Sequence, residues 1–202
     1  MAHLIRQMGY VVIAAPDPER SARDLADITG VRITHSDADA SYVSSNGRFC
    51  EVAYQRSETH GIRSVGLEAM DEAAVDEVAM RAQSEGLVIL SDQPSVAKVK
   101  RAIRFATPFG PIFEIHTPIE REAIAPAALN GKRVRRLEHV NVRADDPRGF
   151  HDLVTSLLGM KLSDRTTQYE RAWYRAADGF HHTLAAGPGS GLHHYAFDAH
   201  GF

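Results

Sequence analysis

The sequence predicts an α+β fold of tandem βαβββ modules, and three observations support this prediction. An alternating strand followed by Asp-Pro and an amphipathic helix occurs twice, from Met8 and from Leu137. The two copies align without a gap at an offset of 129 residues, the difference between Asp17 and Asp146. Each copy is followed by short alternating runs that are typical of strands. A fixed offset of this kind indicates internal duplication.

Both copies start and end their helix with the same signals. Asp17 and Asp146 are N-cap residues, each followed by a proline at the first helical position, where the missing N–H costs nothing. Gly30 and Gly159 suit the left-handed turn that ends a helix. The apolar positions at helical spacing are Ala22, Leu25, Ala26 and Ile28 in the first copy and Phe150, Leu153, Val154, Leu157 and Leu158 in the second.

Short strands are predicted after each helix. In the first copy they are "SYVSS" (41–45) and "CEVAYQR" (50–56), and in the second they are "ERAWYRA" (170–176) and "HHTLAA" (181–186). Each copy therefore reads as one βαβββ module.

A second, weaker repeat adds two more modules. "GIRSVGLEA" (61–69) aligns with "GLHHYAFDA" (191–199) at an offset of 130, which places Ser64 on His194. A strand at "GLVIL" and two strands around the Pro-Phe-Gly-Pro turn in 102–117 complete module two. The helix expected between them has its apolar positions at Ala73, Val75, Val78, Ala79 and Ala82. Of module four, the sequence contains only the first strand.

This repeat divides the chain into three parts. Residues 1–118 form an N-terminal two-module domain without a metal, and residues 119–135 form a linker that ends in "GKRVR", the first five residues of a basic run. Residues 136–202 form an incomplete C-terminal metal-binding domain, made of module three and the first strand of module four.

Composition and charge narrow the function classes. The formal net charge of -3 gives no electrostatic reason to expect nucleic acid or a membrane as partner. The apolar run "YVVIAA" is followed at once by "PDPER" and reads as a strand and a helix cap, not as a signal peptide. The single cysteine, Cys50, fits a reducing compartment, so the cytoplasm is the expected location.

Three histidine motifs carry a resemblance to a known family. They are "RLEHVNV" around His139, "FHHTLAAG" around His182 and "GLHHYAF" around His194. With the module pattern, they make the chain resemble the vicinal oxygen chelate superfamily, and within it the type I extradiol ring-cleaving catechol dioxygenases. The resemblance implies four modules in two open barrels, with iron in the second barrel only.

Strand alternation leads to the same histidines. It places Leu137, His139 and Asn141 on one face of their strand, and it turns His193 away from His194 in the last strand. The repeat alignment superposes His139 on His194, so their imidazoles could meet at a common centre. Two imidazoles and one carboxylate with open positions are the ligands used by non-haem Fe(II) oxygenases.

The resemblance assigns roles to these residues. It makes His139 and His194 ligands of Fe(II), with Mn(II) as the alternative, and it places the third ligand on the last strand of module four, beyond Phe202. His182, on the strand before the His-His strand, is the expected acid-base residue. Asn141 is expected to contact the substrate or a ligand, and Trp173 to form an aromatic wall of the pocket.

The N-terminal copy lacks this ligand set. Its counterparts of the two histidines are Tyr10 and Ser64, which leave only Glu114 of a possible triad. The sequence therefore predicts a degenerate, metal-free copy in which Glu114 is structural.

The expected activity is insertion of O₂ into a catechol-type ring beside its two hydroxyls, as in aromatic hydrocarbon catabolism. The expected partners are a small aromatic diol and O₂, with homo-oligomeric assembly and no nucleic acid or membrane. Two alternatives stay open. One is a metal-dependent isomerase or lyase of the glyoxalase or epimerase type, and the other is a non-catalytic binding protein of the bleomycin-resistance type.

Overall fold

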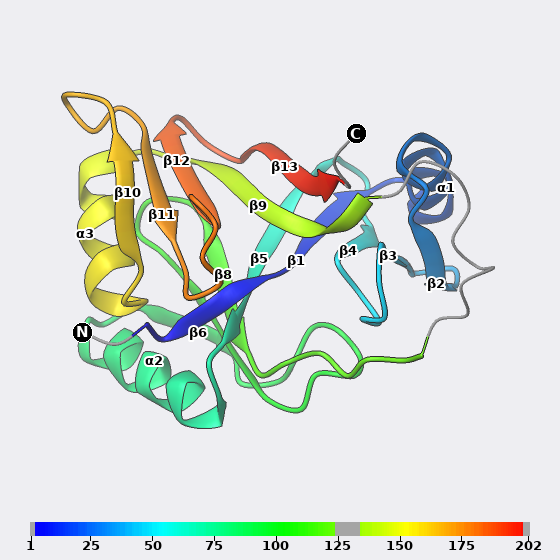
Figure 1. Cartoon of the computed structure of the whole chain (residues 1–202), viewed down its shortest axis with the longest axis horizontal. Helices are drawn as coiled ribbons and strands as arrows, with labels where there is room; N and C mark the ends of the chain where they lie inside the picture. The colour runs from blue at the N-terminus through cyan, green and yellow to red at the C-terminus, as the bar shows by residue number, and fades with distance from the viewer. Residues whose placement is uncertain (1–2, 124–133, 200–202) are drawn as a thin grey trace.

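The computed structural model describes residues 3–123 and 134–199 (Figure 1). Module one consists of β1 (Ile5–Ala15), α1 (Pro18–Thr29), β2 (Arg32–Ser36), β3 (Ala40–Ser44) and β4 (Val52–Arg56). Module two consists of β5 (Gly61–Ala69), α2 (Glu72–Ser84), β6 (Val88–Ser91), β7 (Ala102–Ala106) and β8 (Ile112–His116). Module three consists of β9 (Val134–Ala144), α3 (Pro147–Leu157), β10 (Lys161–Arg165), β11 (Ala172–Arg175) and β12 (Leu184–Pro188), and β13 (Leu192–Ala199) follows it. The predicted α+β class and module order are confirmed.

The strands form two sheets. The N-terminal sheet has eight strands in the order β2-β3-β4-β1-β5-β8-β7-β6, and the C-terminal sheet has five in the order β10-β11-β12-β9-β13. In each complete module the last strand returns parallel to the first, as β4 does to β1, β8 to β5 and β12 to β9. The first strands of consecutive modules pair antiparallel, as β1 does with β5 and β9 with β13. The C-terminal sheet therefore repeats one module and the first strand of the next.

The helix boundaries follow the predicted signals. The side chain of Asp17 accepts a hydrogen bond from the N–H of Arg20 at 3.0 Å, and that of Asp146 accepts one from the N–H of Arg148 at 3.0 Å. Gly30 and Gly159 adopt left-handed backbone conformations, with φ of 75° and 63°. The three helices have 12, 13 and 11 residues, and none within the described ranges is long and apolar enough to cross a membrane.

Two predicted helix positions are wrong. Ile28 is 77% exposed because it lies six residues beyond the buried Ala22, roughly 120° around the helix from it. In α2 the buried alanine is Ala74, and the predicted Ala73 is exposed because it projects one residue, roughly 100°, away from that face. Both helices therefore bury a narrower stripe than the sequence pattern indicates.

The two sheets share one hydrophobic core. It includes Val11 of β1 and Val140 of β9, and the ring of Phe113 on β8 stacks on Phe150 of α3 at a centroid distance of 6.0 Å. Glu51 accepts a hydrogen bond from the backbone N–H of Leu137 at 3.0 Å across the same boundary. The packing of the C-terminal sheet is therefore tied to the N-terminal one.

The predicted domain boundaries stay predictions. β9 begins at Val134, inside the proposed linker 119–135, and residues 124–133 of that linker lie outside the described residues.

Candidate metal centre

The central strand pairs of the two halves have the same register. The pairs between β1 and β5 include Gln7–Glu68, Tyr10–Gly66 and Val12–Ser64, and those between β9 and β13 include Arg136–Asp198, His139–Ala196 and Asn141–His194. These pairs correspond at the offsets of 129 and 130 found in the sequence. The predicted equivalences of Tyr10 with His139 and of Ser64 with His194 therefore hold in space.

The irregularities of the strands are repeated as well. The register shifts by one residue at Arg6, Gly9 and Arg63 in the N-terminal pair and at Arg135, Glu138 and His193 in the C-terminal pair. Each of these six residues has no direct partner on the opposite strand. An extra residue of this kind bends its strand and changes the direction of neighbouring side chains.

The shift at Glu138 corrects the predicted faces of β9. Leu137 was expected on the same face as His139, but it is 1% exposed and packs in the core with Val140. His139 instead contacts His182 and His194. Simple alternation fails here because the extra residue reverses the phase of the strand.

The shift at His193 corrects the predicted direction of that side chain. His193 was expected to point away from His194, yet their Nδ1 atoms lie 2.6 Å apart. Both side chains are exposed. As the extra residue of the strand, His193 is not held to the opposite face.

His139 and His194 face each other from neighbouring strands. Their Nε2 atoms are 3.2 Å apart and their rings lie at 81°. Two nitrogens that bind one metal ion at about 2.1 Å, at angles between octahedral and tetrahedral, are roughly 3.0–3.4 Å apart. The separation therefore fits a shared divalent cation.

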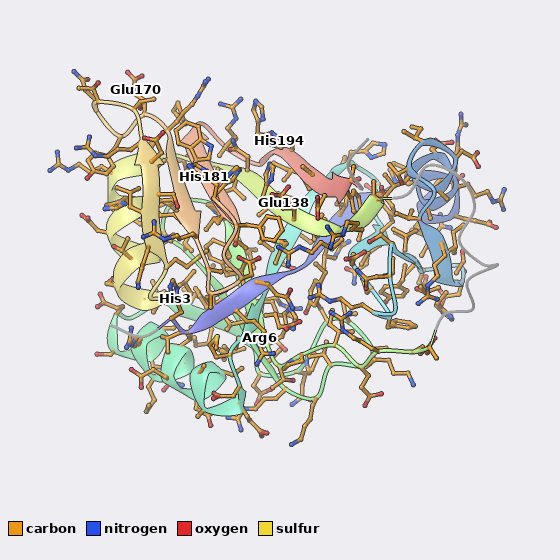
Figure 2. The ribbon with its side chains drawn as sticks, viewed as in Figure 1. His3, Arg6, Glu138, Glu170, His181 and His194 are labelled. Atoms are coloured by element: carbon orange, nitrogen blue, oxygen red, sulfur yellow. The ribbon has the colours of Figure 1, made fainter. Side chains whose placement is uncertain are left out.

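The surroundings of His139 fit the same interpretation. Its Nδ1 is buried and has no hydrogen-bond partner among the described residues, and it lies 3.6 Å from Oε2 of Glu138. Figure 2 labels Glu138, on β9, and His194, on β13. A metal-bound histidine usually donates its other N–H to a carboxylate or carbonyl. Within residues 3–123 and 134–199, no three histidine, cysteine, aspartate or glutamate side chains are arranged to hold a metal. The assignment of His139 and His194 as metal ligands stays a prediction.

His182 lies beside this pair, although not on a strand. β12 starts at Leu184, because the turn after β11 contains Gly179 with φ of 82° and the pairing resumes only there. The ring of His182 is 4.2 Å from that of His139, between centroids, and its Nδ1 is 3.1 Å from Nδ1 of His181. Burial, with smaller contributions from the neighbouring histidines, lowers the pKa of His182 to about 4. Burial, followed by His139 and His193, also lowers the pKa of His194.

Asn141 and Trp173 lie on the same face of the sheet as His194. Directly paired residues run across four strands in the row Trp173, Ala185, Asn141 and His194. Paired residues project from the same face, so this row lines the side that holds the histidine pair. Trp173 and Asn141 are half-buried, and their assigned roles stay predictions.

The N-terminal counterpart is filled by protein groups. Glu114 is fully buried and accepts hydrogen bonds from the Tyr10 hydroxyl, from the Ser95 backbone N–H at 2.9 Å and from Nη1 of Arg104 at 3.2 Å. Burial, then the adjacent Glu114 carboxylate, raises the pKa of Tyr10. The Tyr10 ring stacks on His116 at a centroid distance of 4.5 Å. Three protein donors therefore surround the carboxylate that a metal would need.

Sequence reasoning gave no role to Glu138, Ser95 or Arg104, and it predicted the wrong direction for His193. Gly9 was the available signal for the first of these, because a glycine inside a strand pattern often marks a bulge and Gly9 corresponds to Glu138. No comparable signal marked Ser95 and Arg104, which reach Glu114 from a loop and from β7.

Comparison with known proteins supports the fold. No family model matches the chain. A curated relative, the manganese-dependent 2,3-dihydroxybiphenyl 1,2-dioxygenase of Geobacillus genomosp. 3, is 24% identical over 189 residues, which cover 79% of this chain and 55% of the relative. The chain therefore spans about half the length of this curated relative.

Two kinds of solved structure share the architecture. A mutant of homoprotocatechuate 2,3-dioxygenase from Brevibacterium fuscum has a TM-score of 0.86 and 21% identity over 99% of this chain and 58% of that one. The Mn(II)-bound glyoxalase from Novosphingobium aromaticivorans has a TM-score of 0.83 and 20% identity over 96% of this chain and 66% of that one. The expected vicinal oxygen chelate fold is confirmed.

Proposed function

We propose that this chain carries the metal-binding histidines of an extradiol-type dioxygenase, which inserts O₂ into a catechol-type ring beside its two hydroxyls. The observation that carries the proposal is the 3.2 Å separation of Nε2 of His139 and Nε2 of His194, on paired strands of a vicinal oxygen chelate fold. Similarity to two ring-cleaving dioxygenases supports the reaction class.

In this proposal, His139 and His194 hold Fe(II) or Mn(II). When bound, such a cation supplies Lewis acidity for the two hydroxyl oxygens of the diol and open positions for diol and O₂. The resemblance favours Fe(II), and the names of the manganese-dependent relative and of the Mn(II)-bound glyoxalase support Mn(II).

The third ligand is proposed to lie on a strand parallel to β13. In the N-terminal half, β8 pairs parallel with β5 and places Glu114 beside Gly66. The counterpart of Gly66 is Ala196, on the edge of β13 that has no partner strand among the described residues. The glutamate expected beyond Phe202 would reach the histidine pair from this edge.

The remaining residues on this face handle the proton and the ring. Nδ1 of His182 is in contact with His181, so Nε2 is the nitrogen that we assign to accept and return the proton of a substrate hydroxyl. The Asn141 amide is assigned to a hydrogen bond with a substrate oxygen, and the Trp173 indole to one wall of the ring site.

We also propose that the N-terminal half binds no metal. The support is the engagement of Glu114 with Tyr10, Ser95 and Arg104, since the Arg104 guanidinium already neutralises the carboxylate.

The test uses the full natural polypeptide that contains this chain. It is loaded with Fe(II) or Mn(II) under nitrogen and then mixed with air and catechol, 3,4-dihydroxyphenylacetate or 2,3-dihydroxybiphenyl. We expect a yellow ring-opened product and consumption of O₂ equimolar with the diol, abolished in His139→Ala and retained in the exposed-histidine control His35→Ala. Failure to cleave any diol in the metal-loaded protein would overturn the proposal.

The same preparation separates the alternatives. Conversion of a hemithioacetal with zinc, cobalt or nickel but not with iron would indicate a glyoxalase-type isomerase, the class of one structural neighbour. Tight ligand binding that ignores chelators would indicate a binding protein. Homo-oligomeric assembly and a cytoplasmic location stay predictions.

A further inference from the structure

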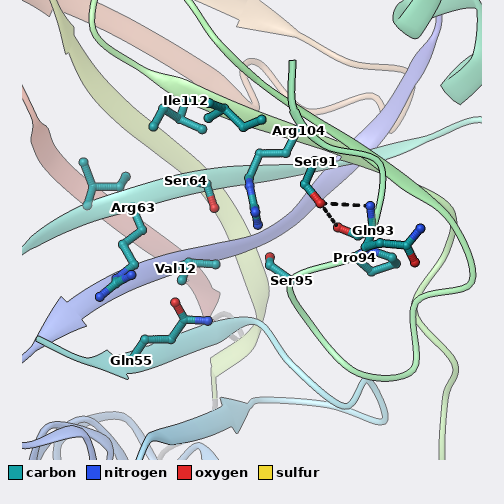
Figure 3. A pocket seen from close by; sticks show the side chains of 12 residues that line it. Val12, Gln55, Arg63, Ser64, Ser91, Gln93, Pro94, Ser95, Arg104 and Ile112 are labelled. Atoms are coloured by element: carbon teal, nitrogen blue, oxygen red, sulfur yellow. Dashed lines mark hydrogen bonds between the residues drawn. The ribbon is translucent and has the colours of Figure 1, made fainter. Parts of the chain in front are cut away.

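A cavity lies in the N-terminal half, and the histidine pair is not among its lining residues. Its volume is about 760 Å³, within the range of small-molecule sites (Figure 3). Strands β1, β4 and β5 form one side, and β6, β7, β8 and the loop after β6 form the other. All of its lining residues belong to the first two modules.

The position of this cavity corresponds to the face that carries the candidate metal centre. Val12 and Ser64, which line it, pair across β1 and β5. Their counterparts in the C-terminal half are Asn141 and His194. The duplication has therefore placed the cavity-lining residues Val12 and Ser64 at positions equivalent to Asn141 and His194.

Two arginine side chains line the cavity: Arg104 is paired with Glu114, and Arg63 has no ion-pair partner among the described residues. Its 12 lining residues include Arg63 and Arg104 and no aspartate or glutamate (Figure 3). Nη2 of Arg63 donates to the carbonyl of Arg56 at 3.1 Å, which anchors this exposed side chain at the rim. Arg104 is 29% exposed and engages Glu114 through Nη1, so the remainder of its guanidinium faces the open space. An anion would be attracted to this side of the cavity.

Hydroxyl groups converge on the same space. Oγ of Ser95 is buried and lies beside the Tyr10 hydroxyl. The side chains of Ser64, Ser95 and Arg104 point toward one another in Figure 3. A bound oxygen anion would offer these hydroxyl groups a charged acceptor.

The cavity is also lined by apolar side chains. They include Val12, Ile62 and Ile112, beside the polar Gln55, Ser91 and Gln93. Such a surface favours a ligand with an apolar body as well as an anionic head.

We propose that this cavity binds a small organic carboxylate with an apolar, ring-sized body, held by Arg63, Arg104 and the hydroxyl of Ser95. The site is independent of the metal centre and does not rest on the proposed dioxygenase activity.

Calorimetric titration of the full chain with benzoate in EDTA tests the proposal, with benzyl alcohol as the uncharged analogue. We expect benzoate to bind at least about tenfold more tightly than benzyl alcohol. Arg63→Gln should weaken benzoate binding by roughly fivefold or more. The control Arg23→Gln, on the exposed face of α1, should leave binding unchanged.

Two further variants locate the site and avoid the folding risk of Arg104→Gln, which would leave Glu114 without its cation. Ser95→Ala keeps the backbone N–H that Glu114 needs and should weaken benzoate binding by a few fold. The double variant His139→Ala/His194→Ala should bind benzoate normally. The proposal is overturned if benzoate does not bind at about 10 mM, if benzyl alcohol binds as tightly, or if the histidine variant loses binding.

Discussion

The strand pairs β1–β5 and β9–β13 share register and bulges, yet their centres differ in chemistry. In the first pair, Tyr10 fills the centre, stacks on His116 and donates to Glu114. In the second, the Nε2 atoms of His139 and His194 lie 3.2 Å apart. The residues of β5 are also more deeply buried than those of β13. Strand β8 covers one edge of β5, whereas β13 has only β9 as a partner among the described residues.

This difference separates the role of the backbone from that of the side chains. The register fixes where two facing side chains meet, and the residue types decide whether a cation or a network of hydrogen bonds occupies that place. The position of the Tyr10 ring depends on a small residue on the neighbouring strand. A Cβ at Gly66 would lie 2.5 Å from the Tyr10 ring, so the aromatic counterpart of His139 requires glycine opposite it.

The largest expected effect is on the free energy of unfolding, when the hydrogen bonds of Glu114 to Tyr10 and Arg104 are removed. Glu114→Ala should destabilise the protein by about 3–5 kcal/mol, because it leaves Arg104 and the Tyr10 hydroxyl without their buried acceptor. Urea unfolding measures the change. The matched variant His194→Ala removes an exposed side chain and should change the free energy of unfolding by less than about 0.5 kcal/mol without metal. Equal losses in the two variants would contradict the contrast between the centres.

His116, which stacks on Tyr10, should make the free energy of unfolding depend on pH. Burial lowers the pKa of His116 to about 4 from the 6.5 that is usual for histidine, and its Nδ1 contacts the carbonyl of Thr117 at 2.7 Å. Between these pKa values the unfolded chain binds a proton that the folded one does not. The free energy of unfolding should therefore fall by roughly 3 kcal/mol as the pH drops from 6.5 to 4, with no contribution from this group above that window.

Urea unfolding at a series of pH values tests this dependence. His116→Gln should flatten the pH profile, whereas His60→Gln, at an exposed position, should leave it unchanged. A profile that is equally steep in His116→Gln would show that other groups cause it.

Mn(II) binding at the His139–His194 pair should weaken when one of the two histidines is removed. His139→Ala should weaken Mn(II) binding by about 100-fold, or about 2.7 kcal/mol, because one of two protein nitrogens is lost. Titration followed by the Mn(II) electron paramagnetic resonance signal measures the affinity. His35→Ala should match the unchanged protein, and equal affinity in all three proteins would exclude His139 as a ligand.

The smallest expected effect concerns the glycine that accommodates Tyr10. Gly66→Ala should destabilise by about 1–3 kcal/mol through overpacking against the ring. The counterpart change Ala196→Gly should cost about 1 kcal/mol or less, since it creates no clash. Thermal unfolding of both variants checks the order, and a larger loss in Ala196→Gly would contradict the equivalence of the two positions.

Much of this arrangement could be predicted from the sequence. The gap-free repeat predicted that Tyr10 and His139 are equivalent, and the Asp-Pro caps predicted both helix starts, because these signals depend on local chemistry. Alternation alone could not predict the direction of His193 or the burial of Leu137, since it assumes a regular strand and each lies at or next to a register shift. The hydrogen bond from Arg104 to Glu114 could not be predicted either, because it is a contact of tertiary packing.

The most direct test of the central claim is pulsed electron paramagnetic resonance of the Mn(II)-loaded chain with ¹⁵N-labelled histidine. We predict coupling to two imidazole nitrogens, reduced to one in His194→Ala and unchanged in Tyr10→Phe, which alters only the N-terminal centre. Absence of histidine coupling, or a spectrum that changes in Tyr10→Phe but not in His194→Ala, would contradict the assignment of the metal to the β9–β13 pair.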